Sequence, residues 1–198
     1  MRITPTRLPG VLIVHPERFG DVRGYFVETY HAERYAAAGM PAVFVQDNQS
    51  SSRRGTIRGL HLQVRRPQAK LIRVLSGAIL DVAVDVRVGS PTFGQSVTMP
   101  LTAESLDQAY IPEGFAHGFA VLSDQADIEY KCSDLYDPDG QLGILWNDPA
   151  LAIEWPVDVP VLSDRDRMNP RLADIVDRLP RFPSQHCKDS HKSGRQRR

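Results

Sequence analysis

The side chains best suited to take part in a reaction lie in one stretch of strand-forming residues, from position 55 to position 77. In an extended strand alternate side chains share a face, so His61 and Gln63 point the same way. A histidine beside cationic groups suits the removal of a proton next to an oxygen that gains negative charge. A surface strand whose charges are solvated is the alternative. The polar residues of this stretch that matter here are Arg58, His61, Gln63 and Lys70.

The composition is that of an ordinary globular protein. The chain has 198 residues, of which 41% are hydrophobic and 24% are charged, which is enough to fill the core of one domain. A formal net charge of zero gives no overall field that would attract nucleic acid or a membrane. Two cysteines, Cys132 and Cys187, make no disulfide framework, and the sequence has no leader pattern or long apolar segment. We therefore expect a cytoplasmic protein that binds neither nucleic acid nor membranes.

The C-terminal end differs from the rest of the chain. Residues 184–198 hold five Lys or Arg against one Asp, and they contain no aliphatic or aromatic side chain. Such a segment cannot bury a face of a core, so we expect a disordered basic tail after a single domain of residues 1–183. Binding of a polyanion by the tail is the alternative.

Short apolar segments separated by turn residues recur along the chain, which predicts an antiparallel sandwich or barrel. One short helix is expected over residues 31–38 and another over residues 169–179, where Asn-Pro provides a start signal. Residues 19–24 are expected to form a turn, and residues 112–118 a loop. The expected strands are 11–14, 25–30, 43–50, 56–64, 69–76, 78–86, 95–99, 107–111, 119–122 and 126–132.

Two motifs resemble the signatures of the cupin superfamily. The second motif is Pro-Glu-Gly-Phe-Ala-His at residues 112–117. The first motif consists of Gly55, His61, Gln63, Lys70 and Gly77, and its interval to Lys70 is longer than the usual pattern of the superfamily. The resemblance implies an all-β jelly-roll barrel, or double-stranded β-helix, with His61 and His117 pointing into its mouth.

The first motif departs from the cupins that bind a metal. Those proteins normally place a second His and a Glu where Gln63 and Lys70 stand here. Two His with an amide and a cation, and without an anionic partner, make a poor site for a divalent ion. We therefore expect no metal and no cofactor, and a metal-dependent cupin enzyme is the least favoured alternative.

A closer resemblance, to the dTDP-4-dehydrorhamnose 3,5-epimerase family, covers the chain as far as Pro180. It rests on seven ordered blocks, since any one block alone would be a weak signal. The blocks are Phe19 to Glu28, Gln46 to Ser50, Arg58 to His61, Ile111 to Phe119, Glu129 to Cys132, Trp146 to Pro149 and Leu162 to Asp166.

The family resemblance implies a metal-free cupin isomerase, usually a homodimer, with short peripheral helices that include a C-terminal one. Its substrate would be a dTDP-4-keto-6-deoxyhexose. The implied reaction inverts C3 and C5 of dTDP-4-dehydro-6-deoxy-D-glucose and gives dTDP-4-dehydro-L-rhamnose.

The resemblance also implies catalytic roles. His61 matches the base that abstracts a proton, and Lys70 matches the cation beside the C4 oxygen. Tyr130 matches the acid that reprotonates C5 from the opposite face, with Tyr136 as a second candidate. The aspartate that orients the base matches Asp166, and Asp164 is its near rival, because the sequence alone does not choose between the two.

Binding residues carry over in the same way, with arginines suited to bidentate contact with phosphate. Two positions depart from the family. The family usually has a Glu at the position of Gln141 and a Lys at the position of Arg165. Because Gln lacks the charge of Glu, a substrate contact at position 141 is in doubt. Arg23 and Glu28 are expected to reach in from a second subunit. The sugar-diphosphate contacts are Arg23, Arg58 and His117, and the nucleotide contacts are Glu28, Gln46 and Asn48.

Two other functions stay open. A mono-epimerase would invert only C3 or only C5 of such a sugar, and the presence of Tyr130, His117 and the Gly-Phe-Ala-His-Gly loop favours the double epimerase over it. A non-catalytic cupin would bind the sugar nucleotide as a sensor. A His with an Asp partner and a nearby Lys is more machinery than binding alone requires.

Overall fold

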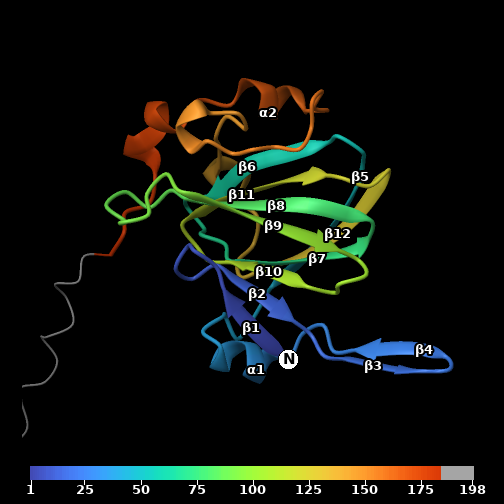
Figure 1. Ribbon diagram of the computed structural model, residues 1–198. Coiled ribbons are helices and arrows are strands. Elements are labelled where there is room, and N and C mark those ends of the chain that lie inside the picture. The colour runs from blue at the N-terminus through green and yellow to red at the C-terminus, as the bar shows by residue number, and fades with distance from the viewer. Residues whose placement is uncertain (184–198) are drawn as a thin grey trace, which may run out of the picture.

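Two antiparallel sheets face each other in the computed structural model, which describes residues 1–183 (Figure 1). The six-stranded sheet has the order β1-β2-β10-β7-β12-β5, and the five-stranded sheet has the order β13-β6-β11-β8-β9. The strands are β1 (Arg2–Pro5), β2 (Leu12–His15), β3 (Arg18–Asp21), β4 (Gly24–Val27), β5 (Gln46–Arg53), β6 (Ile57–Gln63), β7 (Lys70–Ser76), β8 (Ala78–Asp85), β9 (Ser96–Thr102), β10 (Gln108–Ile111), β11 (Phe115–Val121), β12 (Gln125–Cys132) and β13 (Gln141–Gly143).

The helical elements are short and lie at the periphery. They are α1 (Ala32–Ala37), α2 (Asp164–Met168) and three 3₁₀ helices, η1 (Pro138–Gly140), η2 (Pro149–Leu151) and η3 (Leu172–Arg178). In Figure 1, α2 lies above β6, and α1 lies at the opposite end of the molecule. None of the helices within residues 1–183 is long and apolar enough to cross a bilayer.

Side-chain alternation along the strands builds three apolar layers. The layer between the sheets contains Ile72 of β7, Ile128 of β12 and Phe119 of β11. On the outer face of the five-stranded sheet, Leu60 and its neighbours are covered by the C-terminal segments. On the outer face of the six-stranded sheet, buried residues pack with α1. Removing these side chains from water is the main term that stabilises the barrel.

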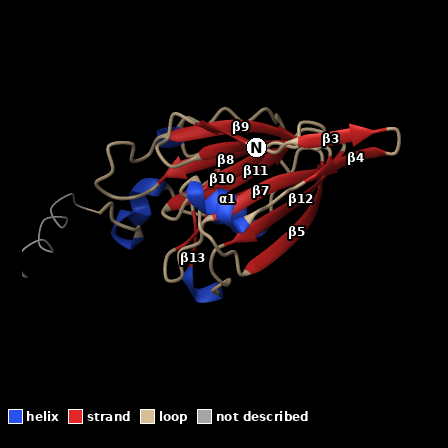
Figure 2. Ribbon diagram, turned by 90° about the horizontal axis from the view of Figure 1, so that it is seen from below, coloured by secondary structure: helices blue, strands red, loops and turns tan. Residues whose placement is uncertain are grey.

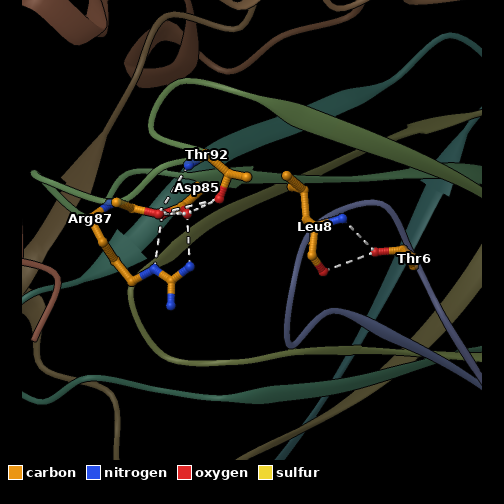
Figure 3. A network of polar contacts seen from close by, with 6 residues as sticks. Thr6, Leu8, Asp85, Arg87 and Thr92 are labelled. Carbon is orange, nitrogen blue, oxygen red and sulfur yellow. Dashed lines mark hydrogen bonds and ion pairs between the residues drawn. The ribbon is translucent and has the colours of Figure 1, made fainter. Parts of the chain in front are cut away.

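A polar network anchors the end of β8 (Figure 3). The carboxylate of Asp85 is fully buried and accepts hydrogen bonds from Arg87 (2.7 Å to Nη2), Ser90 Oγ (2.6 Å) and Thr92 Oγ1 (2.6 Å). Burial alone raises the pKa of Asp85, but the hydrogen bonds from Arg87, Ser90 and Thr92 outweigh it and lower that pKa to about 2. Figure 3 also shows the Thr6 hydroxyl closing a turn onto the backbone of Leu8. The network fixes the turn between β8 and β9.

Most of the expected strands are confirmed, and so is the helix of residues 31–38, which appears as α1. The prediction of a turn over residues 19–24 is wrong. Residues 18–21 and 24–27 form the hairpin β3–β4, in which Phe19 pairs with Phe26, so the turn is only two residues long. The hairpin projects away from both sheets (Figures 1 and 2).

Two other boundaries differ from the prediction. Residues 115–118 belong to β11 rather than to a loop, because β11 pairs with β8 from Phe115 onward. The expected helix of residues 169–179 is replaced by η3, since Asn169 ends α2 and the backbone of Ile175 is not helical. Leu172 and Ile175 are both buried against the five-stranded sheet, and this packing overrides the local start signal. The predicted tail of residues 184–198 lies outside the described residues, and the single domain over 1–183 stays a prediction.

Candidate active site

A cavity of about 730 Å³ is lined by residues of β5, β6, β7, β11, β12 and β13 and by Val161, Leu162, Ser163, Arg165 and Asp166. Of the predicted site residues, the structure brings ten to this cavity. They are His61, Lys70, Tyr130, Asp166, Gln46, Asn48, Arg58, His117, Gln141 and Arg165. Gln63, Gln68, Cys132 and Tyr136 also line it, although the site prediction did not include Gln68 and Cys132.

His61 on β6 is hydrogen-bonded to Asp166 on α2, with 2.5 Å between Nε2 and Oδ1. Ser163 caps α2 by accepting a hydrogen bond from the backbone of Asp166, so this carboxylate is held at the helix start. Asp166 is buried, whereas Asp164, its rival in the sequence, is exposed. With Nε2 bound to Asp166, Nδ1 is the ring nitrogen of His61 left for a ligand.

The carboxylate of Asp166 is stabilised in its charged form. Burial by itself raises the pKa of Asp166, but hydrogen bonds from His61 and from the backbone of Gly59 hold this pKa below its usual value. An ionised Asp166 orients the imidazole of His61 and favours a proton on Nε2. This is the arrangement that prepares a histidine to act as a base through its other nitrogen.

A second His–Asp pair lies beside the first. His117 on β11 is the register partner of His61 on β6, and its Nε2 is 2.7 Å from Oδ2 of Asp81 on β8. Two glycines allow β6 and β11 to approach so closely. A Cβ on Gly59 would lie 2.7 Å from the Cα of Gly118, and one on Gly118 would lie 2.7 Å from a backbone oxygen.

Sequence reasoning missed Asp81 as a site residue. Asp81 interrupts the apolar run of residues 78–86, is fully buried, and lies on the same face of β8 as Ile79 and Ala83 of the core. A carboxylate on the core face of a strand needs a partner, and this pattern was the available signal.

Burial shifts the pKa of Lys70 and the pKa of Tyr130 in opposite directions. Burial lowers the pKa of Lys70, while the charges of Cys132 and Asp81 act in the opposite direction. Burial raises the pKa of Tyr130, the Cys132 charge adds to this, and Arg58 opposes it. The phenol of Tyr130 therefore keeps its proton near neutral pH and is able to donate it.

Amide side chains link the rim of the cavity. Gln46 donates to Asn48 Oδ1 at 2.9 Å and accepts from the backbone of Tyr136 at 2.8 Å. Gln141 Oε1 accepts from the Tyr136 hydroxyl at 2.7 Å and from Arg165 Nη1 at 3.0 Å. The two residues that depart from the family pattern, Gln141 and Arg165, therefore contact each other.

Arg23 and Glu28 do not line the cavity of their own chain. Arg23 lies in the turn of the β3–β4 hairpin and pairs with Asp21, and Glu28 pairs with Arg34 at 2.7 Å. Their predicted position, reaching into the cavity of a second subunit, stays a prediction. Within residues 1–183, no three His, Cys, Asp or Glu side chains gather as metal ligands do. The expectation of a metal-free site is likewise still a prediction, based on the chemistry of Gln63 and Lys70.

Comparison with known proteins places this chain in a family. The family model described as dTDP-4-dehydrorhamnose 3,5-epimerase matches residues 5–174. The dTDP-4-dehydrorhamnose 3,5-epimerase of Pseudomonas aeruginosa is 49% identical over 176 residues, which cover 88% of this chain and 97% of that protein. The dTDP-4-dehydrorhamnose 3-epimerase of Streptomyces niveus is 42% identical and covers 89% of this chain and 86% of its own.

A solved structure agrees with the sequence comparison. The dTDP-6-deoxy-D-glucose-3,5-epimerase of Legionella pneumophila, in complex with dTDP-4-keto-L-rhamnose, has a TM-score of 0.90 and 46% identity, and the match covers 92% of this chain and 99% of that one. The expected cupin jelly roll is thereby confirmed. The chain belongs to the dTDP-4-dehydrorhamnose 3,5-epimerase family and is an epimerase of the isomerase class.

Proposed function

We propose that the protein inverts C3 and C5 of dTDP-4-dehydro-6-deoxy-D-glucose and gives dTDP-4-dehydro-L-rhamnose. The observation that carries this proposal is one cavity in which the His61–Asp166 pair, Lys70 and Tyr130 come together. Relatives named for the double epimerisation, at up to 49% identity, support it.

The reaction begins with a proton beside the C4 ketone. The ketone acidifies the C–H bonds at C3 and C5, and Nδ1 of His61 accepts the proton while the electron pair moves to the C4 oxygen. Positioned base catalysis of this kind contributes about 10²–10⁴-fold. Asp166 holds the ring of His61 in the required orientation and stabilises the imidazolium that forms.

The enolate then has to be stabilised and reprotonated. The ammonium of Lys70 faces the developing negative charge in a buried setting, where the loss of such a donor costs about 3–4 kcal/mol. The phenol of Tyr130 delivers a proton to C5 from the face opposite His61. The C4 ketone re-forms as the C–H bond is made, so the configuration at that carbon is inverted without net redox change.

Binding is proposed to divide along the cavity. Arg58, whose guanidinium is held by Ser52 at 3.0 Å, and His117 contact the sugar-diphosphate part. Gln46 and Asn48 contact the nucleotide. Gln141 and Arg165 close the rim as a hydrogen-bonded pair.

A homodimer would complete the site. The projecting β3–β4 hairpin carries Arg23 at its tip and exposes Phe19, Tyr25 and Phe26, of which Phe26 is 68% exposed. Aromatic side chains exposed on a single arm are a feature of interaction surfaces. We propose that the hairpin packs against a second copy and brings Arg23 and Glu28 to its cavity. A cytoplasmic location stays a prediction.

The mono-epimerase is the second candidate, because relatives of this kind are similar to the chain. Besides the 3-epimerase of Streptomyces niveus, the 3'-monoepimerase ChmJ of Streptomyces bikiniensis, solved with dTDP-quinovose, has a TM-score of 0.84 and 37% identity and covers 89% of this chain and 92% of its own.

One experiment separates these functions. The protein is incubated with dTDP-4-keto-6-deoxyglucose in D₂O, and deuterium at C3 and C5 is followed by NMR. Deuterium at both carbons is expected, and deuterium at only one carbon would identify a mono-epimerase. A protein that binds the nucleotide sugar without exchange at either carbon would be a sensor. His61→Asn should abolish exchange, whereas substantial residual exchange would mean that another base operates.

A further inference from the structure

Asp81 is the most deeply buried charged group of the cavity region, and the proposed chemistry gives it no role. Its exposed fraction is 0%, it lies in the middle of β8, and its register partners are Phe119 on β11 and Met99 on β9. A carboxylate in such a place is costly to bury unless it is paired. Oδ2 of Asp81 receives a hydrogen bond from His117, but Oδ1 is buried and has no hydrogen-bond partner within the described residues.

The contact with His117 constrains the imidazole. A carboxylate accepts hydrogen bonds only, so the nitrogen that faces it, Nε2, carries a proton. Nδ1 is then the atom of His117 that is left for a ligand in the cavity. A carboxylate that holds a ring in one orientation and tautomer is the device already seen at Asp166, where it acts on His61.

The charge of Asp81 also reaches Lys70. Burial is the main cause that lowers the pKa of the Lys70 ammonium, and Asp81 is one of the two groups that counteract it. The other titratable and charged side chains that line the cavity are Arg53, Arg58, His61, His117, Tyr130, Cys132, Tyr136, Arg165 and Asp166. The negative charge of Asp81 favours the charged form of Lys70 against the effect of burial.

We propose that Asp81 is a positioning residue that acts on two residues of the cavity, His117 and Lys70. It holds His117 as the Nε2–H tautomer with Nδ1 toward the ligand, and its negative charge favours the ammonium form of Lys70. One buried carboxylate thereby acts on both the Lys70 donor, on which enolate stabilisation depends, and the Nδ1 acceptor of His117, which faces the ligand. The kinetic part of this inference rests on the proposed epimerase function, and the part on the ring of His117 does not.

The first test observes the ring without substrate. The full chain labelled with ¹⁵N-histidine contains six histidines, and His117→Gln identifies the signals of His117 by their loss. In wild-type protein, at a pH where the ring is neutral, the proton is expected on Nε2 and not on Nδ1. In Asp81→Asn this preference should be lost, because an amide either accepts from or donates to Nε2. A wild-type ring protonated on Nδ1, or an unchanged tautomer in Asp81→Asn, would overturn the proposal.

The second test follows turnover against pH. Without the negative charge of Asp81 the pKa of Lys70 falls further, so the alkaline limb of the kcat profile of Asp81→Asn should move to lower pH. A shift of this alkaline limb by about one pH unit lowers kcat about tenfold at a given pH on the limb. We also expect kcat to fall more than KM rises, since the effect is on proton positions and charge. An alkaline limb at the wild-type pH would contradict the role assigned to Asp81.

Asp107 provides the matched control. It pairs with His15 at the same distance of 2.7 Å, and neither residue lies in the cavity. Asp107→Asn should change only the signals of His15 and leave the alkaline limb in place. If the wild-type protein shows no deuterium exchange at C3 or C5 of the dTDP-sugar, the proposed function is wrong. The tautomer of His117 still decides whether Asp81 holds that ring as inferred.

Discussion

His61 and His117 are register partners on the neighbouring strands β6 and β11, and in each of them Nε2 contacts a buried aspartate that comes from elsewhere in the fold. Asp166 approaches from α2, and Asp81 approaches from β8. The two imidazoles therefore present Nδ1 as the nitrogen available for a ligand. The cavity thus combines two neighbouring histidines of the same arrangement, whose aspartate partners come from different elements of the fold.

The pairing of His61 predicts a difference between two nearby aspartates. Asp166→Asn should lower kcat by about 10²–10⁴-fold with little change in KM, because His61 loses its orientation and its preferred tautomer. Asp164→Asn is the matched control, since Asp164 lies two residues away on the same helix and is exposed. It should keep kcat within about twofold, and steady-state kinetics on both variants checks this. Equal losses in the two variants would show that the helix, rather than the carboxylate of Asp166, matters.

The position of Tyr130 predicts that the reaction at C5 can be lost while proton exchange at C3 continues. Tyr130→Phe should keep deuterium exchange at C3 and lose net inversion at C5, because the phenol proton is missing while His61 still removes protons. NMR of the product formed in D₂O measures both. The ring of Phe retains the apolar contacts of the tyrosine, so the fold should be unchanged. Loss of exchange at both carbons to the same extent would show that Tyr130 has a different role.

The exposed β3–β4 hairpin predicts a dimer that a single substitution in the hairpin should weaken. Phe26 is 68% exposed in the single chain, so Phe26→Asp should place a charge in the proposed dimer contact and shift the protein towards a monomer. Sedimentation measures the mass, and a parallel rise in KM is expected because Arg23 no longer reaches the partner's cavity. Val159→Asp is the control, since Val159 is equally apolar, is 83% exposed and lies outside the hairpin. A wild-type monomer at micromolar concentration would contradict the prediction.

The buried network at Asp85 predicts an acid-sensitive contribution to stability. The folded-state pKa of Asp85 is about 2, below its value in the unfolded chain, so ionised Asp85 stabilises the fold fully above about pH 4. This contribution, of about 2 kcal/mol, is lost as the pH falls from about 4 to 2. Asp85→Asn should lower the free energy of unfolding at pH 7 by at least that amount, because Arg87 also loses its partner.

Urea denaturation of both proteins between pH 7 and pH 2.5 measures this contribution. The gap between wild type and Asp85→Asn should narrow as the pH falls. Asp124→Asn serves as the control, because Asp124 forms an ion pair with Arg54 but its side chain is 98% exposed, so its removal should have little effect at any pH. A gap that is constant with pH would show that the loss comes from packing rather than from the charge of Asp85.

Much of the fold follows from the sequence, because alternation of apolar side chains is a local property. Strands such as β7 and β8 and the short helix α1 were predicted close to their observed bounds. The two wrong predictions have different reasons. Backbone pairing of residues 18–21 with 24–27 forms the hairpin β3–β4 in place of a turn, whereas η3 replaces an α-helix because Leu172 and Ile175 are both buried.

The candidate site divides in the same way. The sequence by itself determined the chemistry that is available, because His61, Gln63 and Lys70 lie within one stretch whose alternation and resemblance can be seen directly. Only the tertiary structure decided which carboxylates complete it. Asp166 was distinguished from Asp164 by burial at a capped helix start, and Asp81 was joined to His117 by the pairing of β8 with β11. A hydrogen bond requires donor and acceptor atoms about 3 Å apart. Such proximity between residues far apart in the chain is created by strand register and helix docking, which no local pattern encodes.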